Sequence, residues 1–209
     1  MRRSRCSGGQ EELMPEHENR TRQALDAALR TLLRKKPLDQ LRVRELTELC
    51  GLRRQSFYYH FKDVYDLFAW SVRQERALLQ ERLEECLTWR QALLVLLDRA
   101  GEERAFYQAV LDQGGQAGLG EMTPMETVLE AVQRYYRNRC GAPPDQEAEE
   151  RERRCGRMLL LSLLESWVRD GAAMPPEELA DALERSAARS AAGAVWQTLW
   201  ERGEWKQTL

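Results

Sequence analysis

A run of hydrogen-bonding and aromatic side chains occupies residues 53–62, with the sequence RRQSFYYHFK. The spacing of Phe57 and Phe61 predicts a short helix that buries both rings on one face. That helix would carry arginines at its leading end and polar side chains turned outward: Arg53, Arg54, Gln55, Ser56, Tyr59 and Lys62. Arginine matches the edge of guanine and glutamine that of adenine, whereas tyrosine, lysine and serine suit phosphate groups. These residues favour recognition of double-stranded DNA.

Two short helices must position these side chains. The pattern predicts one at about 43–50 and another at about 54–61, with Gly51 at the turn between them. Glycine adopts a left-handed backbone conformation at little cost, which suits such a turn. We expect apolar side chains from this region to meet in one small core: Leu46, Leu49, Leu52, Phe57 and Phe61. Two short helices joined by a tight turn form the helix-turn-helix pattern, whose second helix enters the major groove.

The rest of the chain is also expected to be helical, because strand alternation and hairpin turns are lacking. A helix over about 17–35 ends before Pro37, and a long helix over about 63–86 follows the recognition helix. Further helices are expected over about 88–98, 102–112, 123–139, 145–170 and 177–200, with Thr88 and Thr123 as caps. Three glycines predict a flexible loop over 114–121. The expected fold class is all-α, with a three-helix helix-turn-helix head and a helical-bundle body.

Charge separates the expected domains, which are a disordered tail (1–16), a DNA-binding domain (17–68) and an effector-binding and dimerisation domain (69–209). Residues 17–70 contain 11 Lys or Arg and 7 Asp or Glu, a net charge of +4. Residues 1–16 contain three of each, so the whole chain's net charge of −2 leaves −6 for residues 71–209. A basic head on an acidic body favours DNA binding by the head. The alternative is that a net charge of +4 reflects ordinary variation in composition.

Composition excludes several classes of protein. The longest apolar stretch, 158–164, is far shorter than the ~20 residues of a membrane-spanning helix, so no membrane association is expected. No apolar segment follows the arginines at positions 2, 3 and 5, which predicts no secretory signal. Five scattered cysteines indicate reduced thiols and a cytoplasmic location. With two histidines and no catalytic signature, we expect no metal site, no cofactor and no enzyme activity.

The segment from about residue 20 to 68 resembles the TetR family of bacterial regulators. The resemblance rests on VREL at 43–46, CGL at 50–52, FYYHFKD at 57–63 and YDL at 65–67. The wording RQSFYYHF is similar to a subgroup that includes dihydroxyacetone-kinase-operon regulators. Residues 167–171 and 176–179, WVRDG and PEEL, are similar to the C-terminal end of that subgroup.

The resemblance implies roles for individual residues. Base-contacting positions of the family match Arg44, Arg54, Gln55 and Ser56, and positions near phosphates match Tyr58, Tyr59, His60 and Lys62. Arg53 replaces the usual Ser, Thr or Asn that caps the recognition helix, a loss worth about 1 kcal/mol. Val64 replaces a frequent lysine that contacts phosphate. Lys62 either compensates for that lysine or leaves DNA affinity and its salt dependence lower than usual.

Each assignment has a plainer alternative. Arg42 and Arg53 either contact DNA or are solvated, and the two tyrosines either contact DNA or are surface aromatics. His60 either approaches phosphate or closes the helix end. The arginines at positions 2, 3 and 5 either form a minor-groove arm or belong to a disordered tail.

The body contains a candidate ligand site and a candidate dimer interface. Aromatic side chains that either line an effector cavity or form plain core are Trp70, Trp89, Phe106, Tyr107, Tyr135 and Trp167. Proteins with this motif read two half-sites, so we expect a homodimer. The resemblance places its interface on the last two long helices, with candidate residues Leu159, Leu163, Leu183, Ala187, Ala191 and Val195.

The function expected is therefore sequence-specific DNA binding by an effector-responsive transcriptional regulator. The alternative is a DNA-binding protein without a small-molecule ligand, whose body only dimerises or docks a protein partner. An enclosed apolar cavity in the body would favour the first.

Overall fold

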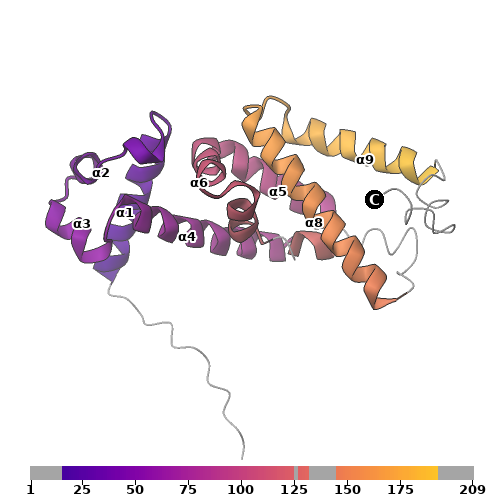
Figure 1. The fold of residues 1–209 in the computed structure, drawn as a ribbon, viewed down its shortest axis with the longest axis horizontal. Coiled ribbons are helices and arrows are strands. Elements are labelled where there is room, and N and C mark those ends of the chain that lie inside the picture. Colours follow the sequence, from indigo (N-terminus) through magenta and orange to yellow (C-terminus); the bar gives the residue numbers. More distant parts are fainter. Residues whose placement is uncertain (1–15, 125–126, 132–144, 193–209) are drawn as a thin grey trace, which may run out of the picture. The chain divides into compact units, whose positions relative to one another are not determined.

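Helices form all the regular structure of the residues that the computed structural model describes, which are 16–124, 127–131 and 145–192, with side chains from 19 to 185 within them. The elements, labelled in Figure 1, are α1 (Glu16–Leu33), η1 (Leu38–Gln40), α2 (Val43–Cys50), α3 (Arg54–His60), α4 (Val64–Glu84), α5 (Trp89–Glu102), α6 (Arg104–Met122), α8 (Gln146–Arg169) and α9 (Pro176–Ala192). The all-α fold class expected from the sequence is confirmed.

The chain divides into two compact units, residues 1–71 and 72–209. The division falls inside α4, three residues after the boundary that the sequence suggested. A single continuous helix therefore contributes its first turns to one unit and the remainder to the other.

The first unit is built on the apolar face of α1. Leu25, Ala28 and Leu29, spaced by three and four residues, are all buried. After α1 ends, Leu38 of η1 is also buried, and α2 packs against α1. These contacts fix the platform on which the turn to α3 begins.

Gly51 ends α2 in a left-handed conformation, with φ +65° and ψ +24°. Its backbone N–H donates to the Glu48 carbonyl at 3.3 Å, and the next N–H, of Leu52, donates to the Thr47 carbonyl at 2.8 Å. A Cβ built on Gly51 would meet no atom within 4 Å. The glycine is therefore required by the backbone angle and not by crowding.

Replacing Gly51 with alanine is expected to lower the free energy of unfolding by about 1 kcal/mol, because an L-residue is strained at this positive φ. Urea unfolding measures the change. Gly114→Ala is the matched control, since Gly114 lies in α6 and its Cβ would also meet nothing within 4 Å. Alanine in a helix should leave stability unchanged or raise it by about 0.5–1 kcal/mol. A Gly51→Ala variant as stable as Gly114→Ala would contradict this explanation.

The second unit confirms one sequence-predicted helix start and corrects another prediction. Thr88 caps α5, since its hydroxyl accepts a hydrogen bond from the Gln91 backbone N–H at 3.2 Å. Residues 114–121, expected to be a flexible loop, are instead part of α6, which kinks at Gly115 (φ +54°, ψ −144°). Leu119 and Met122 are fully buried beyond the kink. Burial of these side chains overrides the low helix propensity of the glycines.

The expected cap at Thr123 is also corrected. Its side chain is buried, and its hydroxyl makes no hydrogen bond to the described residues. Residues 127–131 are helical, whereas the rest of the helix predicted to reach residue 139 lies outside the described residues. The Asp145 carboxylate caps α8 by accepting from the Ala148 backbone N–H at 2.7 Å.

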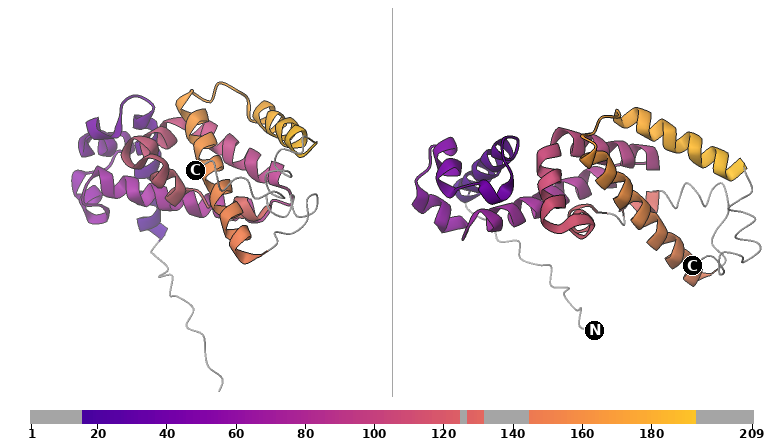
Figure 2. Two further views of the ribbon diagram at one scale, coloured as in Figure 1. Left: turned by 45° about the vertical axis from the view of Figure 1, so that its right-hand side comes forward. Right: turned by 45° about the horizontal axis from the view of Figure 1, so that its top comes forward.

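The later helices of the second unit pack on one another: α6 against α8, and α5 against α6, α8 and α9 (Figure 2). The Arg90 guanidinium on α5 holds α9 through Asp181 at 2.6 Å and Glu184 at 3.2 Å. Gly171, which follows α8 at φ +80°, accepts a hydrogen bond from Arg104 at 2.9 Å. The part of α9 predicted beyond residue 192 lies outside the described residues.

The described residues also bear on membrane-spanning helices, metal ligands and cysteines. Within the described residues, the helices are too short or too polar to cross a membrane. The same residues contain no group of three or more potential metal ligands. Cys50, Cys86 and Cys155 are free thiols.

Candidate nucleic-acid interface

Two aromatic rings fix the orientation of α3. Phe57 is fully buried, and Phe61, directly after the helix, is nearly so. Their ring centroids lie 5.9 Å apart, and Phe61 meets Trp70 edge-on at 5.8 Å. Because residues 57 and 61 lie on one face of the helix, the opposite face must point to solvent. The burial expected for these two rings is confirmed.

The outer face of α3 carries the predicted DNA contacts. Tyr59 is 73% exposed and Tyr58 is 59% exposed, unusual values for large aromatic side chains. The exposed polar residues are Arg53, Arg54, Gln55 and Lys62, while Ser56 and His60 are half-buried. The side chains of Arg53, Arg54 and Gln55 make no hydrogen bond to other described residues. Their donors are available to an external partner.

The start of α3 lacks a side-chain cap, as the presence of Arg53 at the N-cap position predicts. Arg53 adopts an extended conformation (φ −81°, ψ +151°) without a cap hydrogen bond from its side chain. Arginine has donors and no acceptor, so it is unable to bind the amide groups exposed at a helix start. The N-cap position of α3 therefore lacks a capping hydrogen bond and carries an exposed positive charge instead.

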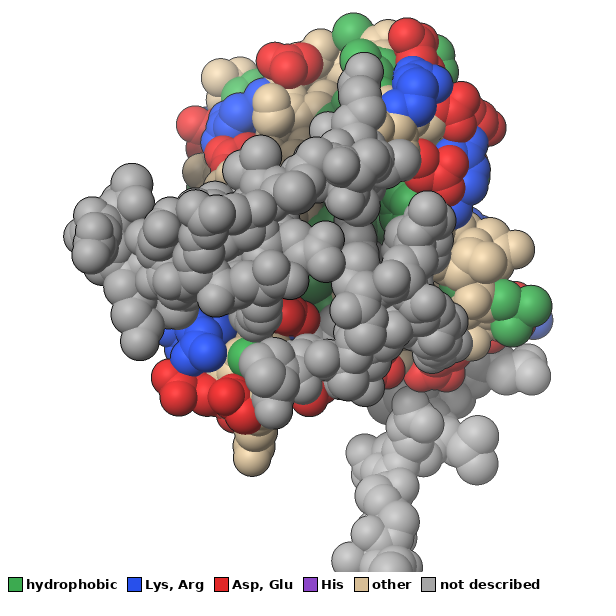
Figure 3. All heavy atoms as spheres, turned by 90° about the vertical axis from the view of Figure 1, so that its right-hand side faces the viewer, with side chains coloured by type: hydrophobic (Ala, Val, Ile, Leu, Met, Phe, Trp, Pro, Cys, Tyr) green, Lys and Arg blue, Asp and Glu red, His purple; other side chains and the backbone are tan. Residues whose placement is uncertain are grey.

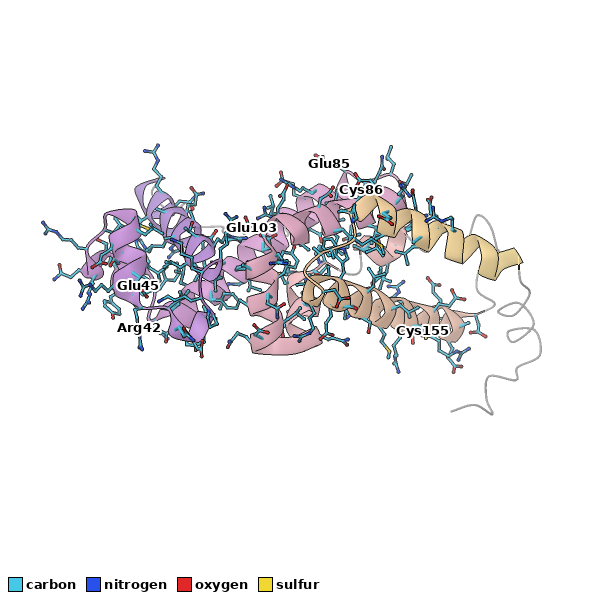
Figure 4. All side chains as sticks on the ribbon, turned by 90° about the horizontal axis from the view of Figure 1, so that it is seen from above. Arg42, Glu45, Glu85, Cys86, Glu103 and Cys155 are labelled. Atoms are coloured by element: carbon cyan, nitrogen blue, oxygen red, sulfur yellow. The ribbon has the colours of Figure 1, made fainter. Side chains whose placement is uncertain are left out.

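An ion pair between Lys36 and Glu45 holds the start of α2. Glu45 is labelled in Figure 4. The Lys36 ammonium lies 2.7 Å from each carboxylate oxygen of Glu45, and it also donates to the Gln40 carbonyl at 3.0 Å. Glu45 accepts in addition from the Arg42 backbone N–H at 3.0 Å. The hydrogen bond from Lys36 lowers the pKa of the Glu45 carboxyl. These bonds join the end of α1 to α2 and leave the Arg42 side chain exposed.

Arg44 is exposed on α2, and it pairs with Glu48 one turn further along. Its Nε donates to Glu48 Oε1 at 2.5 Å, and this bond raises the pKa of the Arg44 guanidinium. The pairing of Glu48 with Arg44 was not predicted from the sequence. The signal was present, because oppositely charged residues four positions apart in a helix lie next to each other.

The predicted core of the motif needs one correction. Leu49 is 52% exposed, and Leu52 is half-buried. The helix instead turns Cys50 toward α1, where its thiol donates to the Ala24 carbonyl at 3.2 Å. Thr47 is also buried, with its hydroxyl bonded to the Val43 and Arg44 carbonyls. Because carbonyls of its own helix accept from this hydroxyl, the polar side chain is compatible with burial.

Val64, where the resembling family often has lysine, is buried at the start of α4. It therefore belongs to the core and has no access to phosphate. Lys62, two residues earlier, is exposed. Lys62 is therefore available to contact a phosphate, whereas Val64 is not.

Comparisons with known proteins agree with this architecture. No family model matches the chain. The HTH-type dhaKLM operon transcriptional activator DhaS of Lactococcus lactis subsp. lactis (strain IL1403) is 27% identical over 90 residues, which are 43% of this chain and 48% of DhaS. The sequence match thus spans about half the length of this curated relative.

Solved structures extend the comparison to most of the chain. The dihydroxyacetone kinase operon activator DhaS superposes with a TM-score of 0.64 at 18% identity, covering 81% of this chain and 95% of DhaS. The chain has the fold of this activator. NalD, the secondary repressor of the MexAB-OprM multidrug efflux pump in Pseudomonas aeruginosa, gives a TM-score of 0.56 at 18% identity, covering 83% and 96%.

In this fold, the candidate ligand contacts occupy different environments. Trp70 packs on Phe61 within the first unit, and Trp89 is half-buried at the start of α5. Phe106 and Tyr107 are fully buried, and the nearly buried Trp167 donates from Nε1 to the Met174 carbonyl at 2.9 Å. Tyr135 lies outside the described residues. Their roles as ligand contacts stay predictions.

The candidate dimer residues are only partly described. On α8, Leu159 is 72% exposed, its neighbour Met158 is also exposed, and Leu163 is half-buried. Leu183 on α9 is half-buried. Ala187, Ala191 and Val195 lie outside the residues whose side chains are described. The surface in Figure 3 mixes acidic and basic side chains, with some hydrophobic ones between them.

Sequence reasoning missed a buried charge in the second unit. Glu75 on α4 has a fully buried side chain, and the Arg99 side chain on α5 is 15% exposed. Arg99 Nε and Nη2 donate to the two carboxylate oxygens of Glu75 at 2.7 and 2.9 Å. The Tyr107 hydroxyl on α6 lies 3.3 Å from the same carboxylate. This network raises the pKa of Arg99 and joins three helices.

Proposed function

We propose that this chain is a cytoplasmic, homodimeric transcriptional regulator that binds specific DNA sequences through α3 and the start of α2. One observation carries the proposal. The rings of Phe57 and Phe61 are buried while arginine, glutamine and tyrosine side chains between and before them are exposed. Neighbouring exposed aromatic side chains on a protein surface mark a site of interaction with another molecule.

The contacts divide by chemistry. Bases are read by donors on α2 and at the leading end of α3: Arg44, Arg54, Gln55 and Ser56. Phosphates are bound by groups around them: Arg42, Arg53, Tyr58, Tyr59, His60 and Lys62. The similarity in sequence to DhaS, an HTH-type transcriptional activator, supports DNA binding in general.

Two arguments support dimerisation through α8 and α9. Two half-sites one helical turn apart need two heads held at a fixed spacing. The adjacent exposed side chains of Met158 and Leu159 supply apolar surface on α8 that a second copy would bury. The residues assigned to this interface are Leu159, Leu163, Leu183, Ala187, Ala191 and Val195.

An effector bound in the second unit would regulate DNA binding, provided that its affinity differs between two states of the protein. DhaS is an activator and NalD a repressor by their descriptions, so either sign is compatible with this fold. The alternative is a body that only dimerises or docks a protein. Full burial of Phe106 and Tyr107, with Tyr107 bonded to Glu75, favours that alternative. Neither version assigns an enzyme activity.

Selection of bound duplexes from a random DNA pool, at two salt concentrations, tests the proposal. We expect enrichment of a palindrome whose half-sites are separated by about one helical turn of DNA, 10–10.5 base pairs, or a multiple of it. Recovery of unselected DNA whose binding disappears at the higher salt concentration would contradict sequence-specific recognition.

A further inference from the structure

Arg44 and Glu48 form an isolated pair on the exposed side of α2. Their side chains are 69% and 60% exposed, and the hydrogen bond joins Arg44 Nε to Glu48 Oε1. Glu45, the other acid of α2, is already engaged by Lys36 and by the Arg42 backbone N–H. Of the two acids on α2, Glu48 is therefore the one that pairs with Arg44.

The pair leaves the recognition edge of the guanidinium open. An arginine carries five N–H donors in a planar fork. Glu48 occupies Nε, whereas Nη1 and Nη2 make no hydrogen bond to described residues. Those two nitrogens present the parallel donors that O6 and N7 of guanine require. A carboxylate on Nε also restricts rotation of the planar group.

The same pair is poorly suited to phosphate. Binding to the DNA backbone depends on net positive charge and on release of counterions. An arginine paired with a carboxylate contributes almost no net charge, and the carboxylate repels a phosphate nearby. A guanine edge is neutral, so it accepts hydrogen bonds from the pair without this repulsion.

We propose that Glu48 is a positioning residue for DNA readout, which orients Arg44 toward guanine and keeps it from binding phosphates. The inference rests on the proposed function, since it assumes that α2 meets DNA. It assigns to Glu48 a contribution to specificity, made by weakening the binding of incorrect DNA.

Two substitutions separate charge from orientation. Glu48→Gln removes the charge but retains an oxygen that accepts from Arg44 Nε, whereas Glu48→Ala removes both. Binding of each full-length variant to a random-sequence duplex is measured between 50 and 200 mM salt. We expect both variants to bind this duplex more tightly than the original protein, with a log–log salt slope steeper by about 1. Their advantage should then shrink roughly threefold across that salt range.

Base preference gives the second readout. In a duplex selection, Glu48→Ala should lose roughly tenfold in preference for guanine at one position of each half-site, and Glu48→Gln should retain most of it. In an Arg44→Ala background, Glu48→Ala should change no base preference. Tighter binding to unselected DNA distinguishes this role from damage to the fold, which would weaken all binding.

Asp39→Asn is the matched control, because Asp39 is an exposed acid on η1 and its replacement changes net charge equally. Equal salt slopes for Asp39→Asn and Glu48→Gln would reduce the effect to net charge and overturn the inference. Unchanged guanine preference in Glu48→Ala would also overturn it. If the original protein enriches no sequence at all, the proposed function fails and this inference fails with it.

Discussion

Replacing Arg99 with methionine is expected to lower the free energy of unfolding by about 3 kcal/mol or more, because it removes the cationic partner of a buried carboxylate. Glu75 is fully buried and receives two hydrogen bonds from Arg99. Methionine fills much of the same volume, so the loss is mainly electrostatic. For a chain of this size, the melting temperature should fall by roughly 10 °C in a thermal unfolding experiment.

Arg90→Met is the matched control for this prediction. Arg90 also pairs with two acids of the second unit, but the pairs are more exposed, at 30% for Arg90 and 48% and 41% for its partners. Exposed pairs contribute about 0–1 kcal/mol, so this variant should lose little. Equal losses for Arg90→Met and Arg99→Met would show that burial of Glu75 does not set the effect.

A double variant tests the cause directly. Glu75→Gln in the Arg99→Met background removes the buried charge and retains an oxygen that accepts from Tyr107. We expect it to recover at least half of the stability lost by Arg99→Met, since the buried charge that lost its arginine is gone. A double variant less stable than Arg99→Met would mean that packing of the arginine stem, and not its charge, stabilises the unit.

The sequence predicted the elements whose signals are local. Apolar spacing located α1, Thr88 located the start of α5, and Gly51 located the turn of the motif. Local signals were insufficient where tertiary burial decides the outcome. The segment 114–121 contains three glycines, yet burial of Leu119 and Met122 keeps it helical.

Side-chain partners distant in sequence were beyond prediction. Glu75 and Arg99 are 24 residues apart on different helices, and each looks like one charge among many in a chain with 32% charged residues. The exposure of Leu49 depends on the rotation of α2 about its own axis where it packs on α1. Apolar spacing over eight residues leaves this rotation undetermined. By contrast, the outer face of α3 was predictable because two rings of known spacing define its inner face.

That division between faces leads to the prediction with the largest effect on DNA binding. Gln55→Ala should change which base is preferred at one position of each half-site, with a loss of roughly tenfold or more in discrimination, because glutamine pairs with adenine through two hydrogen bonds. Tyr59→Ala should weaken binding to all duplexes by a similar factor, because a phosphate contact carries no sequence information. Both side chains are exposed, so neither substitution should unfold the protein.

The measurement is a titration of each variant against the selected duplex and against duplexes changed at single positions. Gln40→Ala serves as the control, since Gln40 is an exposed glutamine on η1 outside the proposed contacts. Tyr59→Phe should share the loss of Tyr59→Ala if the hydroxyl binds phosphate, and retain most of the affinity if the ring packs on the sugar. Uniform weakening by Gln55→Ala and Tyr59→Ala alike would contradict the assignment of base reading to Gln55, and would place both residues among the groups that only position α3 on the DNA backbone.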